Sequence, residues 1–315
     1  MEKTAKILVT GASGMVGGSL VRCLQSQGFE NVLTPTHTEL DLTVQADVNA
    51  YFENNRPQYV FHLAARVGGI HANSTYPGQF IYQNTAMQTN VMEACRTYNV
   101  SKLLFPGSAC TYPKMAPQPI QEESFLNGPI EPTNIAYAAA KINGLVMAQS
   151  YAKEYGLKVA LPMPTNTYGV GDNFDPQASH VIPALMTRLH DAKETNLPEV
   201  VLWGTGKPQR EFLYVDDLAD ALIFLMKTET DESIINVGTM AEISIFELAQ
   251  EIAKVVGYTG ELKTDPEKPD GAPRKCLDNS KLKALGWIPK TTLQNGLQQM
   301  YDYHFKAGEA RRTGT

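Results

Sequence analysis

Short apolar runs alternate with stretches of helical periodicity over the first 165 residues of the chain. The apolar runs predict buried strands at 7–9, 31–33, 59–63, 102–106 and 158–163. The periodic stretches between them predict helices at 15–27, 46–54, 79–98 and 136–155. Strands that alternate with helices in this way are typical of βαβ units. We therefore expect an α/β fold in which a parallel sheet is covered by helices on both faces.

The pattern is looser after residue 170. Helical periodicity returns at 181–193, 215–227 and 245–256. The segment 264–274 holds three prolines, which predicts a loop. A chain of 315 residues is long enough for two domains. We expect residues 1–170, with a later return segment near 212–240, to form one domain and residues 171–315 to form mainly a smaller α/β lobe.

The composition limits the classes of function. The chain carries 27 Lys and Arg against 33 Asp and Glu, so its formal net charge is −6, which argues against a nucleic-acid-binding protein. It does not argue against an anionic small ligand, because a local site can be positive on an acidic protein. No stretch reaches the ~20 apolar residues of a membrane span. The four cysteines are scattered without zinc-site spacing, so we expect a cytoplasmic protein with reduced thiols, no metal and no membrane contact.

A glycine-rich loop stands between the first predicted strand and the first predicted helix. It reads GxxGxxG and comprises Gly11, Ala12, Ser13, Gly14, Met15, Val16 and Gly17. Glycines there permit a tight turn and let backbone N–H groups approach a pyrophosphate at the helix N-terminus. The alternative is an ordinary turn, but the position in the first βα unit favours a dinucleotide-binding, Rossmann-type doubly wound sheet.

A second group of residues predicts carbonyl reduction. Tyr137 and Lys141 form a YxxxK pair, whose i,i+4 spacing puts both side chains on one face of a predicted helix. A phenol in this place gives a proton to a carbonyl oxygen as hydride reaches the carbon, and a nearby ammonium favours the phenolate. Ser108, just past the fourth predicted strand, is a candidate hydrogen-bond donor to the same oxygen. The alternative is an unremarkable pair on a surface helix.

These motifs resemble the extended short-chain dehydrogenase/reductase superfamily, and the turn Leu63-Ala64-Ala65 after the third strand fits it too. The resemblance implies that a nicotinamide dinucleotide also contacts Asp41, Leu42, Pro106, Gly107, Tyr137, Lys141, Pro164, Thr165, Asn166, Thr167 and His180. A carboxylate at the end of the second strand would select NAD. Residues 34–38 instead carry hydroxyls and His37, and the first acid is Glu39. This favours NADP(H), with His37 as a contact, although the absence of an arginine leaves NAD open.

Further segments resemble one branch of the superfamily, the GDP-L-fucose synthases, which are GDP-4-keto-6-deoxy-D-mannose 3,5-epimerase/4-reductases. The matching segments are 66–70, 72–77, 80–84, 107–114, 131–134, 164–169, 172–174, 179–185, 210–217 and 268–275. The likeness spans nearly the whole chain, from Lys6 to about Tyr303. It implies a GDP-4-keto-6-deoxy sugar as substrate and a homodimer in which helices 79–98 and 136–155 pack across a two-fold axis.

The resemblance also assigns roles. Cys110 and His180 match the family's epimerisation base and acid, and Tyr137 protonates the C4 oxygen during reduction. The implied contacts with the sugar are Ser108 and Asn166. For the substrate diphosphate the resemblance implies Arg188, Trp203, Arg210 and one residue of the loop 268–275, for which we choose Asp270. Taken without the family, Cys110 reads as a small buried hydrophobe, His180 as a packing residue at a helix N-terminus, Trp203 as core and Arg188 as a solvated helix residue.

The chain departs from the family's pattern around the sugar. The departures are Ala109, Thr111, Ile135-Ala136, Thr167 and Asp175. They leave open a related substrate, such as a 6-deoxy-heptose or a 3,6-dideoxy sugar, or a loss of epimerisation. A cofactor-sensing regulator on the same fold is the non-enzyme alternative, but such proteins tend to lose the Tyr/Lys pair that this chain keeps.

Overall fold

A six-stranded parallel sheet forms the larger part of the molecule. The computed structural model describes residues 1–175 and 179–306. The strands follow in the spatial order β2 (Asn31–Leu33), β1 (Lys6–Thr10), β3 (Tyr59–His62), β4 (Lys102–Leu104), β5 (Val159–Pro164) and β9 (Ile234–Val237). The strand order reverses between β1 and β3, which is where ligands bind at the carboxyl ends of such sheets. The expected α/β fold with a Rossmann-like parallel sheet is confirmed.

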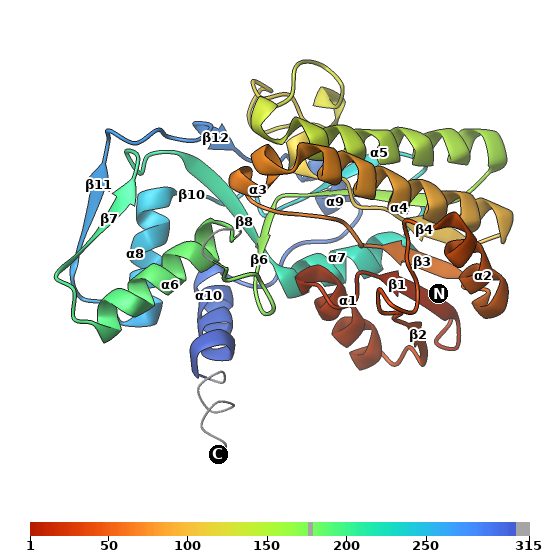
Figure 1. Ribbon diagram of the computed structural model, residues 1–315, viewed down its shortest axis with the longest axis horizontal. Coiled ribbons are helices and arrows are strands. Elements are labelled where there is room, and N and C mark those ends of the chain that lie inside the picture. The colour runs from red at the N-terminus through yellow and green to blue at the C-terminus, as the bar shows by residue number, and fades with distance from the viewer. Residues whose placement is uncertain (176–178, 307–315) are drawn as a thin grey trace.

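Helices cover both faces of this sheet (Figure 1). On one face lie α2 (Gln45–Asn55), α4 (Pro77–Thr97) and α5 (Ile135–Tyr155). They bury Phe52, Val91 and Leu145 against β4 and β5. On the other face lie α1 (Met15–Ser26) and α7 (Val215–Lys227), which bury Leu20 and Leu222. Two apolar cores therefore hold the sheet from either side, as the continuous apolar runs of its strands require.

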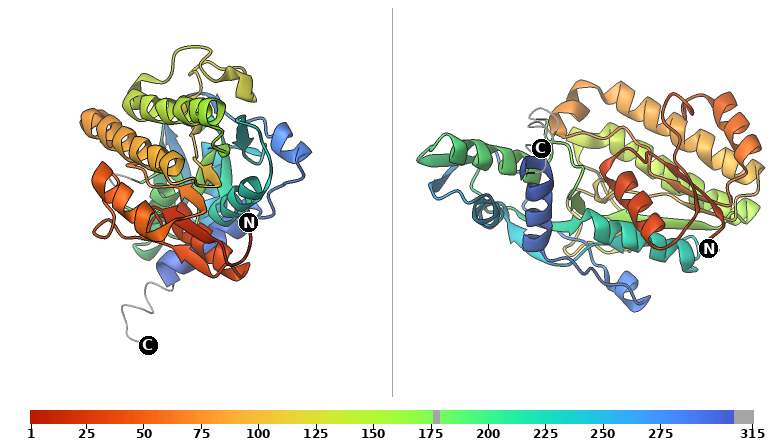
Figure 2. Two further views of the ribbon diagram at one scale, coloured as in Figure 1. Left: turned by 90° about the vertical axis from the view of Figure 1, so that its right-hand side faces the viewer. Right: turned by 90° about the horizontal axis from the view of Figure 1, so that it is seen from below.

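A smaller α/β lobe lies beyond one end of the sheet (Figure 2). Its strands are β6 (Asn166–Tyr168), β7 (Glu199–Trp203), β8 (Gln209–Tyr214), β10 (Glu242–Ser244), β11 (Glu261–Asp265) and β12 (Arg274–Lys275). Its helices are α6 (Val181–Glu194), α8 (Ile245–Val256) and α10 (Leu293–Tyr301). A third core that includes Leu189, Ile252 and Leu297 holds the lobe together. After β8 the chain forms α7 against the large sheet and then β9, which pairs with β5. At β10 it returns to the smaller lobe.

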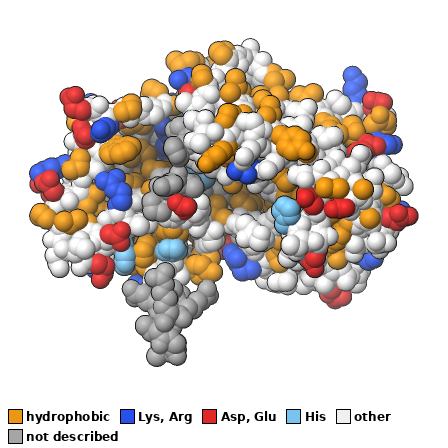
Figure 3. Space-filling model, viewed as in Figure 1, with side chains coloured by type: hydrophobic (Ala, Val, Ile, Leu, Met, Phe, Trp, Pro, Cys, Tyr) orange, Lys and Arg blue, Asp and Glu red, His pale blue; other side chains and the backbone are white. Residues whose placement is uncertain are grey.

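Short elements complete the chain. They are the helices α3 (Ile70–Thr75) and α9 (Ser280–Ala284), the 3₁₀ turns η1 (Ala109–Thr111), η2 (Glu122–Ser124) and η3 (Pro132–Asn134), and the π-helical turn η4 (Asp302–Lys306). Within the described ranges, no helix combines the length and apolar character that crossing a membrane requires. Lys, Arg, Asp and Glu are interspersed over the face seen in Figure 3. Cations for an anionic ligand must therefore be supplied locally.

Candidate active site

The glycine loop follows β1 and lies against the turn after β3. Gly11 has a φ of +73°, and a Cβ added to it would lie 2.7 Å from the Ala64 nitrogen. A Cβ on Gly17 would lie 2.0 Å from the Gly11 carbonyl oxygen, so both positions require glycine. Gly14 is the N-cap of α1 and supplies no side-chain cap. The N-terminal amides of this helix are thus available, and the cradle fits a dinucleotide pyrophosphate.

The two acids after β2 are held within their own turns. Glu39 Oε2 accepts 2.8 Å hydrogen bonds from the backbone nitrogen and the hydroxyl of Thr36. Asp41 Oδ1 accepts from the Thr43 nitrogen at 2.9 Å and from its hydroxyl at 2.7 Å. His37 is exposed beside them. The region therefore presents an imidazole and hydroxyl groups, while the Glu39 carboxylate is folded back onto the chain.

Lys141 is buried at the carboxyl end of β4. Its Nζ donates a 2.9 Å hydrogen bond to the Pro106 carbonyl oxygen and lies 4.6 Å from the centroid of the Phe105 ring. Burial lowers the pKa of Lys141 to about 8. Gly107, which follows Pro106 in the chain, donates its N–H to the Pro162 oxygen at 2.8 Å. The predicted cofactor residues Pro106, Gly107 and Lys141 are therefore brought together by β4, β5 and α5.

Tyr137 lies one helical turn before Lys141, with Ser108 and Cys110 near its phenol. Burial raises the pKa of Tyr137, the electrostatic interaction with Cys110 raises it further, and a hydrogen bond with the Ser108 side chain acts in the opposite direction. The sequence predicts an ammonium that lowers this pKa. In the structure Lys141 is turned to Pro106, so burial dominates and the phenol keeps its proton. The phenol of Tyr137 is therefore protonated at neutral pH in this structure.

Cys110 sits in η1 in a turn fixed by its neighbours. Its backbone N–H donates to Ser108 Oγ at 3.2 Å, and the Thr111 hydroxyl donates to the Ser108 carbonyl oxygen at 2.8 Å. The side chain is half-buried. Lys275 Nζ lies 3.8 Å from the Cys110 sulfur. We did not single out Lys275 for this contact in the sequence, because 165 positions separate the two residues and no local pattern joins them.

His180 precedes α6 and is exposed. Burial raises the pKa of Asp172, whereas a hydrogen bond from the Asn173 nitrogen and the interaction with His180 lower it. Among residues 1–175 and 179–306, Asp172 Oδ2 is buried and finds no hydrogen-bond partner. The preceding Gly171 lies near α1, because a Cβ there would be 3.7 Å from the Met15 Cα. Asp172, which was not among the predicted site residues, thus interacts electrostatically with His180 and follows a glycine that lies close to the glycine-loop helix.

The segment from β5 to β6 joins the two parts of the molecule. Pro164 pairs with Val237 in the large sheet, and the Thr165 nitrogen donates to the Val237 oxygen at 3.0 Å. Asn166 donates from Nδ2 to the Glu211 carbonyl oxygen at 3.1 Å. The Thr167 hydroxyl donates to the Thr165 oxygen at 3.2 Å. This segment therefore runs from the end of β5 into the smaller lobe.

The four residues expected to bind the diphosphate all lie in the smaller lobe. Arg188 Nη2 donates to the Val201 oxygen at 2.6 Å, and Arg210 Nη1 donates to the Ala272 oxygen at 2.7 Å. Asp270 accepts from the Thr205 nitrogen at 2.9 Å and from its hydroxyl at 2.6 Å. Trp203 is 73% exposed, which excludes a place in the core. Both guanidiniums retain donors for an anion, since neither forms an ion pair within the described residues.

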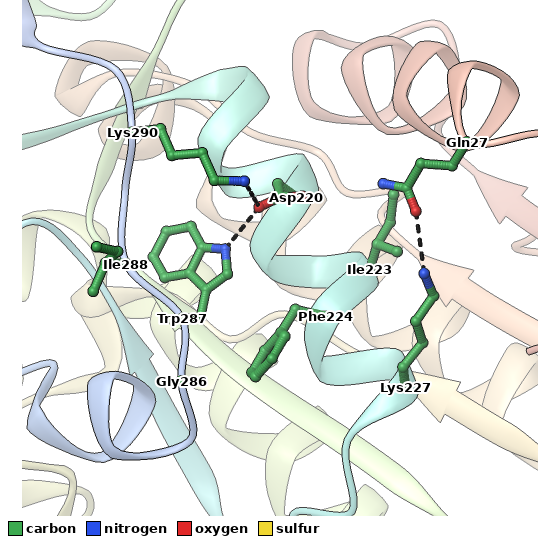
Figure 4. Close-up of a pocket in the computed structure, with 9 residues that line it drawn as sticks. All are labelled: Gln27, Asp220, Ile223, Phe224, Lys227, Gly286, Trp287, Ile288 and Lys290. Atoms are coloured by element: carbon green, nitrogen blue, oxygen red, sulfur yellow. Dashed lines mark hydrogen bonds and ion pairs between the residues drawn. The ribbon is translucent and has the colours of Figure 1, made fainter.

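A separate surface cavity of about 290 Å³ lies against α7 (Figure 4). Its polar atoms bond to one another: Asp220 accepts from Trp287 and Lys290, and Lys227 donates to Gln27. It is on the α1–α7 side of the sheet, whereas Tyr137 is in α5 on the other side. This cavity is therefore not part of the site.

Comparison with known proteins identifies the family of the chain. The sequence profile of the "NAD dependent epimerase/dehydratase family" matches residues 7–238. The chain belongs to this family. It is 52% identical over 305 residues to GDP-L-fucose synthase 1 of Arabidopsis thaliana, with 97% of this chain and 94% of that protein covered. It is 46% identical over 307 residues to GDP-L-fucose synthase of Escherichia coli K12, with 95% and 96% covered.

The fold is also similar to a solved structure. The GDP-L-fucose synthetase of Naegleria fowleri bound to NADP superposes with a TM-score of 0.92 at 29% identity, and 98% of this chain and 95% of that chain are covered. The resemblance seen in the sequence motifs is thus confirmed, and these matches cover 95–98% of the chain.

Proposed function

We propose that the protein converts GDP-4-keto-6-deoxy-D-mannose to GDP-L-fucose by 3,5-epimerisation and NADPH-dependent reduction at C4. The observation that carries the proposal is the grouping of Cys110 and Ser108 with Tyr137, at the edge of a sheet whose glycine loop fits a dinucleotide. The GDP-L-fucose synthases to which the chain is similar give the substrate class.

Epimerisation uses the acidity of the carbons beside the C4 carbonyl. Cys110 Sγ, as a thiolate, takes a proton from C3 or C5, and the electron pair of the broken C–H bond forms an enolate whose charge is on the C4 oxygen. The hydroxyls of Ser108 and Tyr137 stabilise that oxygen by hydrogen bonds. His180, as imidazolium, returns a proton to the opposite face of the carbon, which inverts it. Solvent then takes the proton from Cys110 and returns one to His180, which restores both residues.

Reduction uses the same carbonyl group. NADPH, when bound, supplies the hydride that C4 accepts. Tyr137 transfers its phenolic proton to the oxygen, and the raised pKa of the phenol keeps that proton available at neutral pH. Lys141, anchored on Pro106, reaches the nicotinamide ribose in this proposal. Asn166, Arg188, Trp203, Arg210 and Asp270 hold the GDP-sugar, and arginine suits its diphosphate because guanidinium binds phosphate through paired hydrogen bonds.

The preference for NADPH over NADH rests on the turn after β2. An acid that binds the ribose diol would be free to face the cofactor, yet Glu39 is bonded to Thr36. His37 and the nearby hydroxyls are the donors for a 2′-phosphate. A cytoplasmic location stays a prediction.

A homodimer is part of the proposal. Figure 1 shows α4 and α5 side by side along one face, and their outward positions include the exposed apolar residues Ile81, Tyr82 and Val146. Tyr82 is 67% exposed, which is unusual for an aromatic side chain on a helix. A two-fold axis along this face would bury these residues against their copies.

The departures from the family's pattern do not require another sugar. The hydroxyls of Thr111 and Thr167 donate to the backbone oxygens of Ser108 and Thr165, so neither presents a free donor to a ligand. Ala109 is buried and Ile135 is exposed. These substitutions are satisfied locally, which favours GDP-4-keto-6-deoxy-D-mannose over a heptose or dideoxy relative.

The test is to supply the purified protein with GDP-4-keto-6-deoxy-D-mannose and NADPH and to identify the product by NMR. GDP-L-fucose is expected, with one NADPH oxidised per product. A 6-deoxy-heptose and a 3,6-dideoxy analogue, assayed in parallel, should give lower kcat/KM. A higher kcat/KM for either analogue would replace the proposed substrate, and no NADPH oxidation with any of the three would overturn the enzyme proposal.

A further inference from the structure

Lys275 belongs to the smaller lobe but its ammonium reaches the Cys110 sulfur at 3.8 Å. Its strand β12 is held on two sides. On one side Lys275 pairs in register with Arg210 of β8. On the other, the Cys276 nitrogen donates to Gln118 Oε1 at 2.9 Å and the Cys276 oxygen accepts from the Ile120 nitrogen at 2.8 Å. The backbone of Lys275 is therefore held in place by its strand pairing with β8 and by the hydrogen bonds of Cys276.

The charge of Lys275 is not neutralised by an acid. Within residues 1–175 and 179–306 it forms no ion pair, although the adjacent Arg274 pairs with Glu242 at 2.6 Å. The neighbouring cation Arg210 is turned to the Gln209 and Ala272 carbonyl oxygens. The half-buried sulfur of Cys110 is thus the contact that this free ammonium makes.

Tyr137, a second titratable group that interacts with Cys110, does not supply a cation. Tyr137 of α5 approaches it with a neutral phenol, and Lys141 on the same helix points to the Pro106 oxygen. An ammonium about 4 Å from a thiol favours the thiolate, which is the form of cysteine that accepts protons.

We propose that Lys275 is a positioning residue for epimerisation, which holds Cys110 as the thiolate that takes the proton from the sugar. This inference rests on the proposed function for its chemistry. Lys275 takes no part in the proton transfer itself: the substrate proton moves to Sγ, and the negative charge moves from sulfur to the enolate oxygen. Because Lys275 is part of the smaller lobe and Cys110 part of the larger one, the base is complete only when the two parts are assembled around the site.

The first experiment measures the thiol itself. The pH dependence of iodoacetamide alkylation is followed by mass spectrometry on the Cys110 peptide, which separates it from the half-buried Cys23. K275M should raise the apparent pKa of Cys110 by about one unit or more, a tenfold loss of thiolate at neutral pH. K275R keeps the charge and should restore the wild-type profile. K254M, which removes an exposed lysine on α8, should leave the profile unchanged.

The second experiment measures proton transfer. Without NADPH, K275M should slow deuterium exchange from D₂O into C3 and C5 about tenfold at pH 7, and the loss should shrink as pH rises. The competing hypothesis is that Lys275 binds the diphosphate of the substrate. An unchanged alkylation profile with a raised KM would assign Lys275 to the diphosphate and overturn the proposal. A wild-type protein that shows no exchange would instead refute the proposed function, while the alkylation profile would still report the action of Lys275 on the thiol. Circular dichroism checks that each variant is folded.

Discussion

Lys141 Nζ donates a 2.9 Å hydrogen bond to the carbonyl oxygen of Pro106. This bond ties the middle of α5 to the end of β4, and the same ammonium lies over the Phe105 ring. The lysine is 5% exposed, so its charge is kept in a site that disfavours it. Its protonation therefore links the pH dependence of stability to the pH dependence of catalysis.

The pKa of about 8 for Lys141 predicts how stability changes with pH. Between pH 8 and 10.5 the unfolded chain still binds the proton that the folded chain has lost, so the free energy of unfolding should rise with pH in this window. Urea unfolding should show that, from pH 7 to pH 10, the free energy of unfolding of the wild type rises by on the order of 2 kcal/mol relative to that of K141M. Over the same window the rate of reduction should fall as Lys141 loses its charge. A constant difference between the two proteins would contradict this assignment.

Cys110 and Tyr137 should separate the two half-reactions. C110S should lose deuterium exchange at C3 and C5 by about a hundredfold or more, because a hydroxyl of ordinary pKa is a poor base. It should still oxidise NADPH with a keto-sugar that is already epimerised. Y137F should keep most of the exchange and lose reduction by a similar factor, since it removes the proton donor. Equal losses of both steps in both variants would show that the division is wrong.

The sequence predicts the larger part of the fold because its strands and helices signal themselves locally. The helices 215–227 and 245–256 have the predicted ends, and α5 begins one residue before the predicted position. The sequence predicts an α/β lobe after residue 170 but does not locate its strands. In β7 the exposed positions hold Val201 and Trp203, so the alternation of polar and apolar residues that marks a surface strand is hidden. The segment 264–274 was expected to be a loop throughout. In the structure its first two residues form the end of β11, and its last residue, Arg274, begins β12.

The sequence predicts which residues form the candidate site, but not which charged groups lie beside them or in which direction their pKa values shift. The glycine loop and YxxxK are visible because each is a local motif, whereas Cys110 is singled out only by the resemblance to the family. The lysine beside Cys110 and the carboxylate beside His180 are not, since only the folded chain brings them together. The direction of the Tyr137 pKa also depends on where Lys141 points, which spacing on a helix does not specify.

Arg210 should contribute to substrate affinity rather than to the chemical steps. Its guanidinium is half-buried and held by two backbone carbonyl oxygens, which leaves further N–H donors for a diphosphate. R210M should raise KM for the GDP-sugar about tenfold or more with a smaller change in kcat. R56Q is the control, because Arg56 is exposed after α2 in the other part of the molecule. A large fall in kcat with unchanged KM would place Arg210 in the chemistry instead.

The outward face of α4 and α5 should decide the oligomeric state. Y82D and V146D put a charge where the proposed two-fold axis buries an apolar side chain, so light scattering should find monomers. M115D is the control, since Met115 is 82% exposed in the loop after η1. A dimer in all three variants would move the interface elsewhere, and a monomeric wild type would remove it.

Glu211 should stabilise the loop after β9 and the segment that follows β12, the strand that carries Lys275. Its carboxylate is fully buried and accepts hydrogen bonds from the backbone nitrogens of Thr239, Met240 and Leu277. E211Q replaces an acceptor oxygen by an NH₂ group, which leaves a buried backbone N–H without a partner and costs about 1–3 kcal/mol. Urea unfolding should detect this loss, whereas E229Q, at an exposed ion pair with Lys158, should change stability much less. Because Leu277 is two residues from Lys275, E211Q should also slow deuterium exchange more than NADPH oxidation. An E211Q protein with wild-type stability would show that these amides find other acceptors.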